Sequence, residues 1–423
     1  MSTPEGYTVV NVPAERSADY VHVGGFAFAF TPPAQEASAL AAAMPWHRAR
    51  GIEIADASRG EVGSLAAVHA SFPYRMRVPG GREVATAGLT WVAVHPGHRR
   101  RGLLRTMMAD HFSRSLERGE AVSLLYAAET AIYQRFGYGL AARDLGVEFG
   151  RGTEFRDVEG ADDLTVTIDS ASAQRDGAVI RQVQAQMLRP GAIVDFPDET
   201  IADIFMDLEG DRNGQEERRI AIVRDGDTPV AWALFQRKGD WTPFGPDGTV
   251  NVHGWAALDA KATVRLWRVL VDLDLMAKTW ANRIALDDPL VYLIKDLRGG
   301  KFGVRDNVWC RVLDPKAALE ARGYAADCDV TVALDDPTLP DNAGVWRIAV
   351  TGGDAQVSKI DGADAESADL AMNVQELGAA YLGGTSIGDL YRAGLVKQRR
   401  DGAADQLARA MSSDLQPVTN FGF

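Results

Sequence analysis

The sequence predicts a mixed fold in which α/β regions precede an α+β region, and three patterns along the chain lead to this expectation. Residues 86–118 are typical of a strand, a loop and a helix in that order, and residues 249–273 repeat the order of strand and helix. From about residue 302, several short strands come first, and two helices follow near residues 374–382 and 405–411. Alternating strands and helices indicate an α/β fold, whereas strands followed by helices indicate an α+β fold. Because 423 residues are many for one core, we expect two or three domains.

The loop between the first strand and its helix is suited to binding an anion. Pro96 and Gly97 end the strand, and a helix is predicted from Gly102 to Gly119 because apolar residues recur at three- and four-residue steps. Backbone N–H groups at a helix N-terminus are unpaired, and the helix dipole attracts negative charge to them. With the arginines of residues 99–101 beside it, this helix start predicts a pyrophosphate site. The alternative is a basic helix start on a solvated face.

A second motif follows another apolar strand at residues 122–128. Tyr133 comes at the distance that a short helix needs, and Phe136-Gly137 follows one turn later. A phenol near pKa 10 can protonate a departing thiolate when the surrounding charges favour the transfer. The alternative for Tyr133 is packing between helix and sheet, which is the role we expect for Tyr126 and Tyr138.

Together the two motifs resemble the Gcn5-related N-acetyltransferases (GNAT superfamily). The acetyl-CoA loop of that superfamily reads Arg/Gln-x-x-Gly-x-Gly/Ala, and this chain departs from it only at the last position of Arg99, Arg100, Arg101, Gly102, Leu103 and Leu104. The resemblance implies that acetyl-CoA binds here as the acyl donor. It also implies that Tyr133 lies beside the thioester sulfur and acts as the general acid.

The resemblance narrows to the Eis family (enhanced intracellular survival) of multi-acetylating aminoglycoside and lysine N-acetyltransferases, and it runs through the whole chain. The matching segments are residues 86–89, 92–94, 98–104, 132–133, 135–139, 317–324, 381–383 and 421–423. It implies a GNAT acetyltransferase domain at residues 1–150, a degenerate GNAT-like domain at 151–301 and a sterol-carrier-protein-like α+β domain at 302–423. Residues 256–264 contain neither a glycine loop nor an arginine cluster, so the second domain is expected to have no cofactor site.

The end of the chain is apolar, which favours burial. Phe421-Gly422-Phe423 has no charged side chain, whereas a frayed tail is more often polar. In the Eis family the terminal carboxylate enters the active site, so the resemblance implies that Phe423 supplies the general base for a protonated amine. The alternative is a tail that only docks. The resemblance also implies that backbone groups of Val92, Ala93 and Val94 hold the pantetheine arm, with Val92 at the thioester oxygen.

The acceptor is the least determined part of this prediction. Trp91 stands where the family has an aromatic pocket wall, and Phe28 and Phe30, with Phe26, alternate as in a strand or line a pocket. Core packing is the alternative for all of them. The family's acidic pocket residues do not all carry over, since residues 26–31 contain no aspartate and Gly422 replaces a penultimate glutamate. Three functions therefore compete: an aminoglycoside-like amine acetyltransferase, a protein or peptide lysine acetyltransferase, and a non-catalytic lipid carrier that uses the last domain.

The composition limits the classes of molecule that this protein is expected to bind. A formal net charge of −13 argues against nucleic acid and is compatible with cationic acceptors. Two cysteines make no disulfide framework, which favours a reducing cytoplasm, and the seven histidines show no metal-ligand spacing, so no metal is expected. We see no signal peptide and no membrane-spanning segment. The Eis resemblance implies a homo-hexamer.

Overall fold

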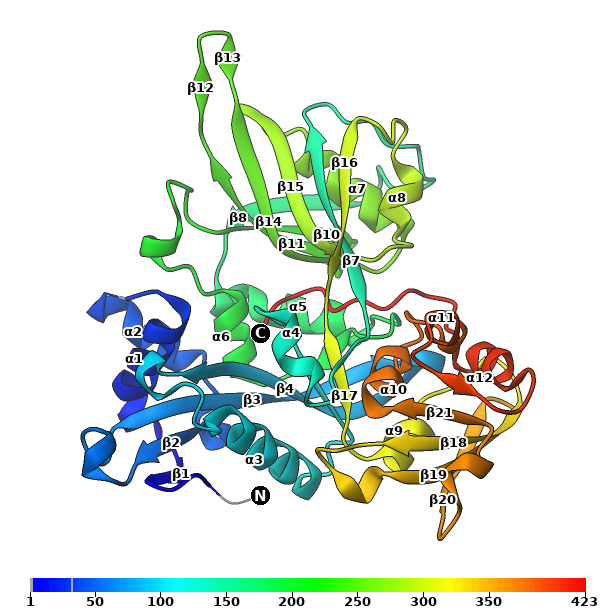
Figure 1. Cartoon of the computed structure of the whole chain (residues 1–423). Helices are drawn as coiled ribbons and strands as arrows, with labels where there is room; N and C mark the ends of the chain where they lie inside the picture. Colours follow the sequence, from blue (N-terminus) through cyan, green and yellow to red (C-terminus); the bar gives the residue numbers. More distant parts are fainter. Residues whose placement is uncertain (1–2, 32) are drawn as a thin grey trace.

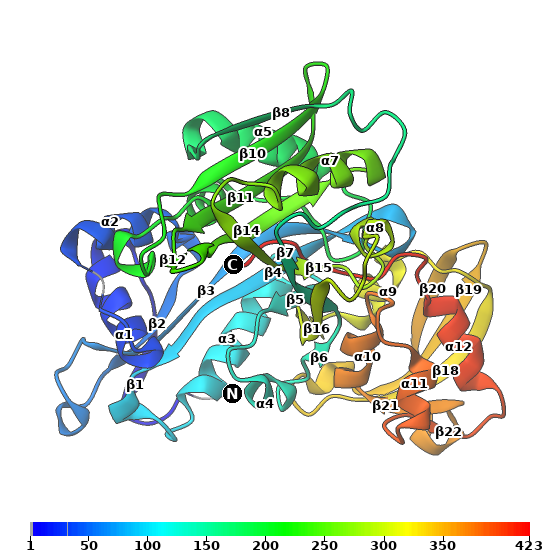
Figure 2. The same cartoon turned by 90° about the horizontal axis from the view of Figure 1, so that it is seen from above.

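The computed structural model describes residues 3–31 and 33–423, and within these residues the strands form three large sheets and one two-stranded ribbon. Figure 1 shows the first sheet at the base of the molecule, the second sheet above it and the third beside the first. The last residues of the chain run between the first two sheets, as both views show (Figures 1 and 2). The mixed α/β and α+β architecture predicted from the sequence is confirmed.

The first sheet carries the strand–loop–helix pattern that the sequence predicts. Its strands are β1 (Tyr7–Asn11), β2 (Arg50–Ile54), β3 (Leu65–Val78), β4 (Arg82–Val94), β5 (Val122–Leu125), β6 (Gly139–Leu140), β9 (Ile193–Asp195) and β17 (Trp309–Val312). They are ordered β1-β2-β3-β4-β5-β17-β6, with β9 beside β3, and β4 and β5 are parallel. The helices of this region are α1 (Ser17–Phe28), α2 (Ala34–Ala42), α3 (Leu103–Glu117) and α4 (Thr130–Gln134).

Helices α1 and α3 cover opposite faces of this sheet. Helix α3 packs in one apolar cluster with Ala67 and Leu89, whereas α1 packs in another with Val68 and Ala93. Ala67 and Val68 are neighbours on β3, and successive side chains of a strand point to opposite faces. The sheet is therefore enclosed on both sides, and the gap described below opens between two covered strands.

The second sheet repeats the same plan. Its strands are β7 (Arg143–Gly150), β8 (Thr165–Ser170), β10 (Arg219–Asp225), β11 (Thr228–Lys238), β14 (Gly248–Ala257), β15 (Met276–Ile284) and β16 (Gly300–Asp306). They are ordered β16-β7-β15-β14-β11-β10-β8, and β14 and β15 are parallel. The helices are α5 (Ala173–Ala185), α6 (Asp198–Ile204), α7 (Ala260–Leu270) and α8 (Pro289–Leu293), and the ribbon β12 (Trp241–Thr242) and β13 (Gly245–Pro246) extends the hairpin of β11 and β14. Buried Trp267 joins α7 to the core through Trp255 and Phe149.

The third sheet has the strands first and most of the helices last, as predicted. Its strands are β18 (Cys328–Asp335), β19 (Gly344–Thr351), β20 (Asp354–Ile360), β21 (Leu370–Asn373) and β22 (Lys397–Gln398), ordered β20-β19-β18-β21-β22. Helix α9 (Pro315–Ala321) precedes them, and α10 (Val374–Ala380), α11 (Ile387–Arg392) and α12 (Ala403–Met411) follow β21. The predicted helices near residues 374–382 and 405–411 correspond to α10 and α12.

Strand pairing crosses the boundaries predicted at residues 150 and 301. Strand β7 precedes the first boundary but pairs with β15 and β16 in the second sheet. Strand β17 follows the second boundary but pairs with β5 and β6 in the first sheet. A sheet accepts any strand with matching register and burial, so these exchanges fasten the first sheet to the second and to the chain beyond residue 301.

Two sequence expectations are corrected by the structure. Residues 26–30 do not form a strand, because α1 continues to Phe28 and ends with Ala29 in a left-handed conformation. The helical conformation is favoured over a strand because Gly24 lets α1 approach the sheet closely. A β-carbon on Gly24 would lie 2.6 Å from the Trp91 ring. The sequence also predicts a helix near residues 183–188, whereas the structure has α5 from Ala173, where the Ser172 hydroxyl caps it, to Ala185.

Candidate active site

The first feature of the site is a gap between two parallel strands. Strands β4 and β5 are in register only at Thr86, Ala87 and Gly88. Strand β4 continues to Val94, so beyond Gly88 its edge on the β5 side is unpaired. On the other side, Thr90 pairs with Ala70 and Ala93 pairs with Val68 of β3, which leaves two β4 residues opposite one.

Those two residues, Trp91 and Val92, form a β-bulge, and Trp91 has a φ of 52°. Bulges redirect a strand and free its backbone groups from the ladder. Ala93 and Val94 return to the register with β3. The predicted pantetheine-binding residues therefore line an open strand edge, and Val92 is the one whose backbone lies in the bulge.

The predicted pyrophosphate loop begins at the end of this edge. Arg99, Arg100, Arg101 and Gly102 are exposed, Leu103 is buried and Leu104 is half-buried. Arg100 has a φ of 60° and Gly102 a φ of 84°, and Gly102 is the N-cap of α3 without any side-chain cap. The first-turn N–H groups of α3 are thus left for an anion.

Arg101 has a second contact that the sequence did not indicate. Its Nη1 donates a hydrogen bond of 2.9 Å to the Tyr7 hydroxyl, which lies 2.9 Å from Nδ1 of His98. Partial burial and the Arg101 charge lower the pKa of His98. Strand β1 therefore supports the loop through Tyr7, and the imidazole favours its neutral form.

Tyr133 lies on α4, the short helix that the sequence predicts. Its ring lies edge-on to Tyr138, with 6.0 Å between the ring centroids. Burial, with the Glu129 charge as a smaller cause, raises the pKa of Tyr133 to about 12. The phenol therefore keeps its proton at neutral pH and is available as a hydrogen-bond donor.

The three residues predicted to line the acceptor pocket come together. The ring centroid of Trp91 lies 6.3 Å from that of Phe28 and 6.1 Å from that of Phe30, with both pairs edge-to-face. Phe28 is 46% exposed, and Trp91 and Phe30 are half-buried. Phe26 instead faces His95, at 4.6 Å. An aromatic wall formed by Trp91, Phe28 and Phe30 thus stands beside the β4 bulge.

The C-terminal segment is fastened at almost every residue. The backbone of Thr419 exchanges hydrogen bonds with the side-chain amide of Asn307, and the Asn420 amide bonds the Gln184 amide and the Trp255 carbonyl. The Tyr126 hydroxyl lies 2.9 Å from the carbonyl oxygens of both Thr419 and Phe421 and shares its one proton between them. Specific hydrogen bonds therefore hold the tail in a defined position at the site. Tyr126, for which the sequence predicted only packing, also holds it.

Phe423 ends at the mouth of the β4–β5 gap. Its ring lies 5.1 Å from that of Tyr74 and 5.3 Å from that of Tyr126. A β-carbon on Gly88, the last β4 residue paired with β5, would lie 2.4 Å from the Tyr74 ring and 3.2 Å from that of Phe423. Glycine is needed here mainly because the Tyr74 ring approaches so closely, and the Phe423 ring lies next to it. Phe423 and Tyr133 pack in separate apolar clusters, so the structure brings each to the gap region but not into contact with the other.

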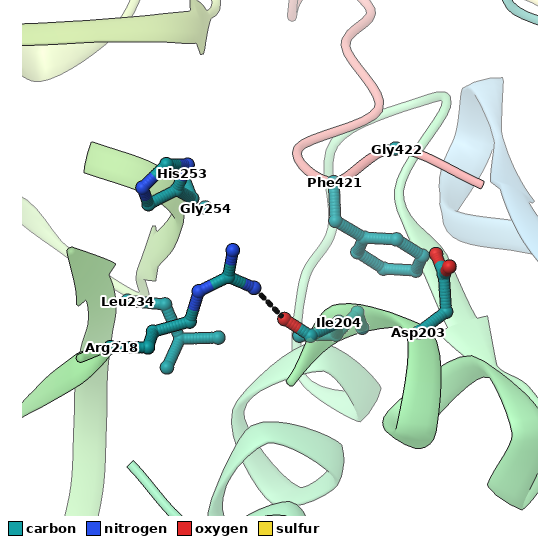
Figure 3. A pocket seen from close by; sticks show the side chains of 8 residues that line it. All are labelled: Asp203, Ile204, Arg218, Leu234, His253, Gly254, Phe421 and Gly422. Carbon is teal, nitrogen blue, oxygen red and sulfur yellow. Dashed lines mark hydrogen bonds between the residues drawn. The ribbon is translucent and has the colours of Figure 1, made fainter. Parts of the chain in front are cut away.

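A cavity of about 150 Å³ lies beside the tail, and the sequence did not indicate it (Figure 3). Its lining residues are Asp203, Ile204, Arg218, Leu234, His253, Gly254, Phe421 and Gly422. Burial raises the pKa of Asp203 to about 6 and lowers that of His253 to about 4. Arg218 donates a 2.8 Å hydrogen bond to the Ile204 carbonyl. These polar residues belong to no sequence motif; only the tail's path brings them to the site.

The helix start of the second sheet that corresponds to the predicted pyrophosphate loop is built differently. Helix α7 follows β14 as α3 follows β4, but its N-cap is Asp259, whose carboxylate accepts a 2.8 Å hydrogen bond from the Ala262 N–H. A carboxylate at this end already satisfies the helix dipole. A second anion would be repelled there.

Two further properties bear on the chemistry. Within residues 3–31 and 33–423, no three His, Cys, Asp or Glu side chains are grouped so as to hold a metal ion, and Cys310 and Cys328 are buried thiols. In the same part of the chain, no helix has the length and apolar character needed to cross a membrane.

Comparison with known proteins agrees with this geometry. Residues 13–141 and 202–312 each match an Acetyltransferase (GNAT) domain, and residues 315–420 match the Sterol carrier protein domain. The chain is 36% identical over 380 residues to an uncharacterized N-acetyltransferase of Streptomyces avermitilis, with 89% of each chain covered. It is 32% identical over 365 residues to N-acetyltransferase Eis of Mycobacterium tuberculosis, covering 82% of this chain and 83% of that one.

The same result follows from solved structures. The fold matches Eis1 from Mycobacterium abscessus with a TM-score of 0.80 and 25% identity, covering 99% of this chain and 100% of that one. It also matches the fold of a GCN5-related N-acetyltransferase from Anabaena variabilis, with a TM-score of 0.81 and 16% identity. Fold and strand gap thus define an acetyltransferase of the GNAT class. More narrowly, the chain belongs to the Eis family of N-acetyltransferases.

Proposed function

We propose that this enzyme transfers the acetyl group of acetyl-CoA directly to an amine, with Tyr133 as general acid and the terminal carboxylate of Phe423 as general base. The observation that carries the proposal is the end of the chain, which is tied down through Phe421 and reaches Gly88 at the mouth of the β4–β5 gap. An amine with pKa near 10.4 needs a base before it can attack, and a terminal carboxylate beside the Phe423 ring would supply one.

The residues of the first domain fit acetyl-CoA. The uncapped N-terminus of α3 and the exposed residues Arg99, Arg100, Arg101 and Gly102 would hold the pyrophosphate, with Leu103 and Leu104 opening the helix. The open edge at Val92, Ala93 and Val94 would pair with the amides of the pantetheine arm. Acetyl-CoA supplies the activated acetyl thioester. Contact between the Val92 N–H and the thioester oxygen would stabilise negative charge that develops there.

In the proposed reaction, the amine nitrogen bonds the acetyl carbon, and the bond from that carbon to sulfur breaks. The Phe423 carboxylate takes the proton that the amine loses. Tyr133 donates its phenolic proton to the leaving sulfur. Because the pKa of Tyr133 is near 12 and that of a thiol near 8.5, complete transfer is uphill unless nearby charge assists it. The hydrogen bond from Tyr133 to sulfur is then the larger contribution.

We further propose that the acceptor amine approaches between the aromatic wall and the cavity beside the tail. Phe421 and Gly422 line that cavity immediately before the base, and Asp203 supplies a carboxylate there. Asp203 would supply the anionic group that a cationic acceptor requires and that residues 26–31 and Gly422 do not provide. Arg218 shares the cavity, so its charge is mixed and favours an acceptor with few positive groups over a polycation.

A panel of amines tests this function. Purified enzyme and acetyl-CoA would be incubated with aminoglycosides, small diamines and lysine peptides, and released thiol would be measured. Turnover above the rate of acetyl-CoA hydrolysis with any class supports the proposal and ranks the acceptors. Native mass spectrometry of the same preparation addresses the carrier function: bound lipid without CoA, with no turnover on any amine, would overturn the proposal.

A homo-hexamer is the proposed assembly. The ribbon of β12 and β13 projects from the second sheet (Figure 1), and it carries Trp241 at 67% and Phe244 at 99% exposure. Large apolar side chains this exposed favour contact with another molecule. Light scattering should give a mass near six chains, and a monomer at every concentration would contradict the assembly.

A further inference from the structure

The second GNAT sheet has a gap like the first, and the chain's own tail occupies it. Strands β14 and β15 pair from Gly248 to Val252, and His253 then forms a bulge against β11. Beyond it, the Asn420 amide donates a 2.9 Å hydrogen bond to the Trp255 carbonyl. A strand gap that binds an extended ligand in the first domain thus binds a polypeptide in the second.

Arg283 crosses this gap from β15 to β14. Two β15 residues, Asn282 and Arg283, oppose the single residue Gly146 of β7, and Arg283 has a φ of 56°. This local conformation is unusual for a residue with a side chain and is retained where the surroundings determine it. It directs the guanidinium across the gap, where Nη1 donates a 3.2 Å hydrogen bond to the His253 carbonyl.

The same guanidinium lies against the tail and its anchor. It stands 5.3 Å from the ring centroid of Tyr126, whose hydroxyl holds the Phe421 carbonyl. A β-carbon on Gly422 would lie 2.8 Å from Nη2 of Arg283. Gly422 therefore accommodates the arginine, and the residue that it precedes carries the terminal carboxylate.

We propose that Arg283 is a positioning residue for this carboxylate: by packing on Gly422 and Tyr126, it fixes the last peptide and places a positive charge near the carboxylate. The inference rests on the proposed function, in which Phe423 supplies the base. A cation near a carboxylate favours its charged form, and a flat guanidinium on an aromatic ring is held more rigidly than a lysine.

Other charged groups also face this part of the tail and set the background for its titration. They are Asp203 of α6, Asp144 of β7, Arg218 before β10, His253 of β14, and the phenols of Tyr74 and Tyr126. Asp203 and Asp144 oppose the effect of Arg283 on the carboxylate, and Arg218 adds to it. Removing Arg283 alone leaves the other groups in place, so the direction of the change can be assigned to it.

The experiment compares Arg283→Met and Arg283→Lys with Lys278→Met, a control that removes a cation from the same strand far from the tail, where Lys278 pairs with Asp247. We expect Arg283→Met to lower kcat about tenfold or more while KM for acetyl-CoA stays within about twofold. The acid limb of its pH–kcat profile should move up by roughly one pH unit, because loss of a cation raises a carboxylate pKa. Arg283→Lys should keep the limb near its original pH and recover part of kcat. The control should behave as the parent.

Gly422→Ala keeps the test decisive if Arg283→Met is poorly folded, because it disturbs the same contact while Arg283 remains; a double-mutant cycle joins the two changes. Gly422→Ala places a β-carbon against the guanidinium, so it should lower kcat in the parent and have little effect when residue 283 is Met. Equal effects in both backgrounds, or an unmoved acid limb in Arg283→Met, would overturn the inference. Adding residues after Phe423 separates the proposed function from the role of Arg283. If the extended enzyme is active, the proposed function itself is overturned. If the extended enzyme is inactive but Arg283→Met has normal activity, only the role of Arg283 is overturned.

Discussion

The two GNAT sheets of this chain share one plan and differ at two points. Each has a central strand with a bulge, Trp91-Val92 in β4 and His253 in β14, followed by a helix and a parallel strand. The helix after β4 begins at uncapped Gly102, whereas the helix after β14 begins at Asp259, which caps it. The fold alone therefore does not make an acyl-CoA site. In the proposed site, the uncapped helix N-terminus and its neighbouring cations would attract an anion, whereas a carboxylate at the cap would repel one.

The strand gaps differ in their occupants. The β14–β15 gap holds Asn420 and Gly422 of the tail, through Trp255 and Arg283. The β4–β5 gap receives only the ring of Phe423 at its mouth and is otherwise lined by free backbone. The second sheet thus holds the segment that, in the proposed reaction, supplies the base to the first. This division of roles can be tested by changes to each side.

The largest effect is expected at the chain end, which joins the two gaps. Adding a few residues after Phe423 should abolish measurable turnover, because the carboxylate moves while every side chain remains. Deleting Phe423 should do the same by withdrawing the charge up to about 3.5 Å. Thiol release measures the activity, and calorimetry with CoA should show unchanged affinity. Full turnover in an extended protein of unchanged melting temperature would mean that the tail only packs.

The next effect is expected at Tyr133, on the first-domain side alone. Tyr133→Phe should lower kcat by roughly 10²-fold, as for the loss of a general acid, and leave CoA affinity unchanged. Tyr138→Phe is a suitable control, since that hydroxyl is buried and bonded to Ser123; it should affect melting temperature more than kcat. Turnover of Tyr133→Phe within about threefold of the parent would assign Tyr133 to packing.

A paired change at the two helix starts tests the comparison directly. Gly102→Val forces a β-branched residue to a φ of 84°, and it should weaken CoA binding by about tenfold or more through roughly 1–3 kcal/mol of strain. Asp259→Ala should lower the free energy of unfolding by about 1 kcal/mol by removing a cap, with no change in CoA affinity. Calorimetry and urea unfolding give both quantities. Unchanged CoA affinity in Gly102→Val would contradict the pyrophosphate site.

The smallest effect on turnover is expected at Asp203. Burial raises its pKa to about 6 in the folded protein, above the value near 3.9 of an exposed aspartate. The folded state therefore binds the proton more tightly, and this contribution to stability is present at pH 4 and lost as the pH rises through about 6. Asp203→Asn should raise the melting temperature at pH 7.5 relative to the parent, with little gain at pH 4.

If Asp203 also receives the amine, Asp203→Asn should raise KM for the acceptor several-fold and leave KM for acetyl-CoA unchanged. Glu217→Gln, a change of an exposed carboxylate nearby in the chain, is the matched control and should change neither quantity. A variant that gains stability but keeps its acceptor KM would remove Asp203 from the acceptor site.

Helices and strands with strong local patterns could be predicted from the sequence alone. The steps of three and four residues after Gly102 predicted α3, and the short spacing before Phe136-Gly137 predicted α4. Periodicity and glycine placement are local properties, so they can be read without a partner. The alternation at residues 26–30 wrongly suggested a strand. Close packing of Gly24 on Trp91 keeps α1 helical as far as Phe28.

The surroundings of the chain end, in contrast, follow from long-range packing and are visible in the tertiary structure alone. Asp203, Arg218, His253 and Arg283 lie in no motif and far from residue 423 in sequence, yet the tail runs past all four. Strands β7 and β17 likewise join sheets outside their expected domains. Such meetings depend on long-range packing and on bulges such as that at Arg283, which arise from the register between strands and leave no pattern in the residues themselves.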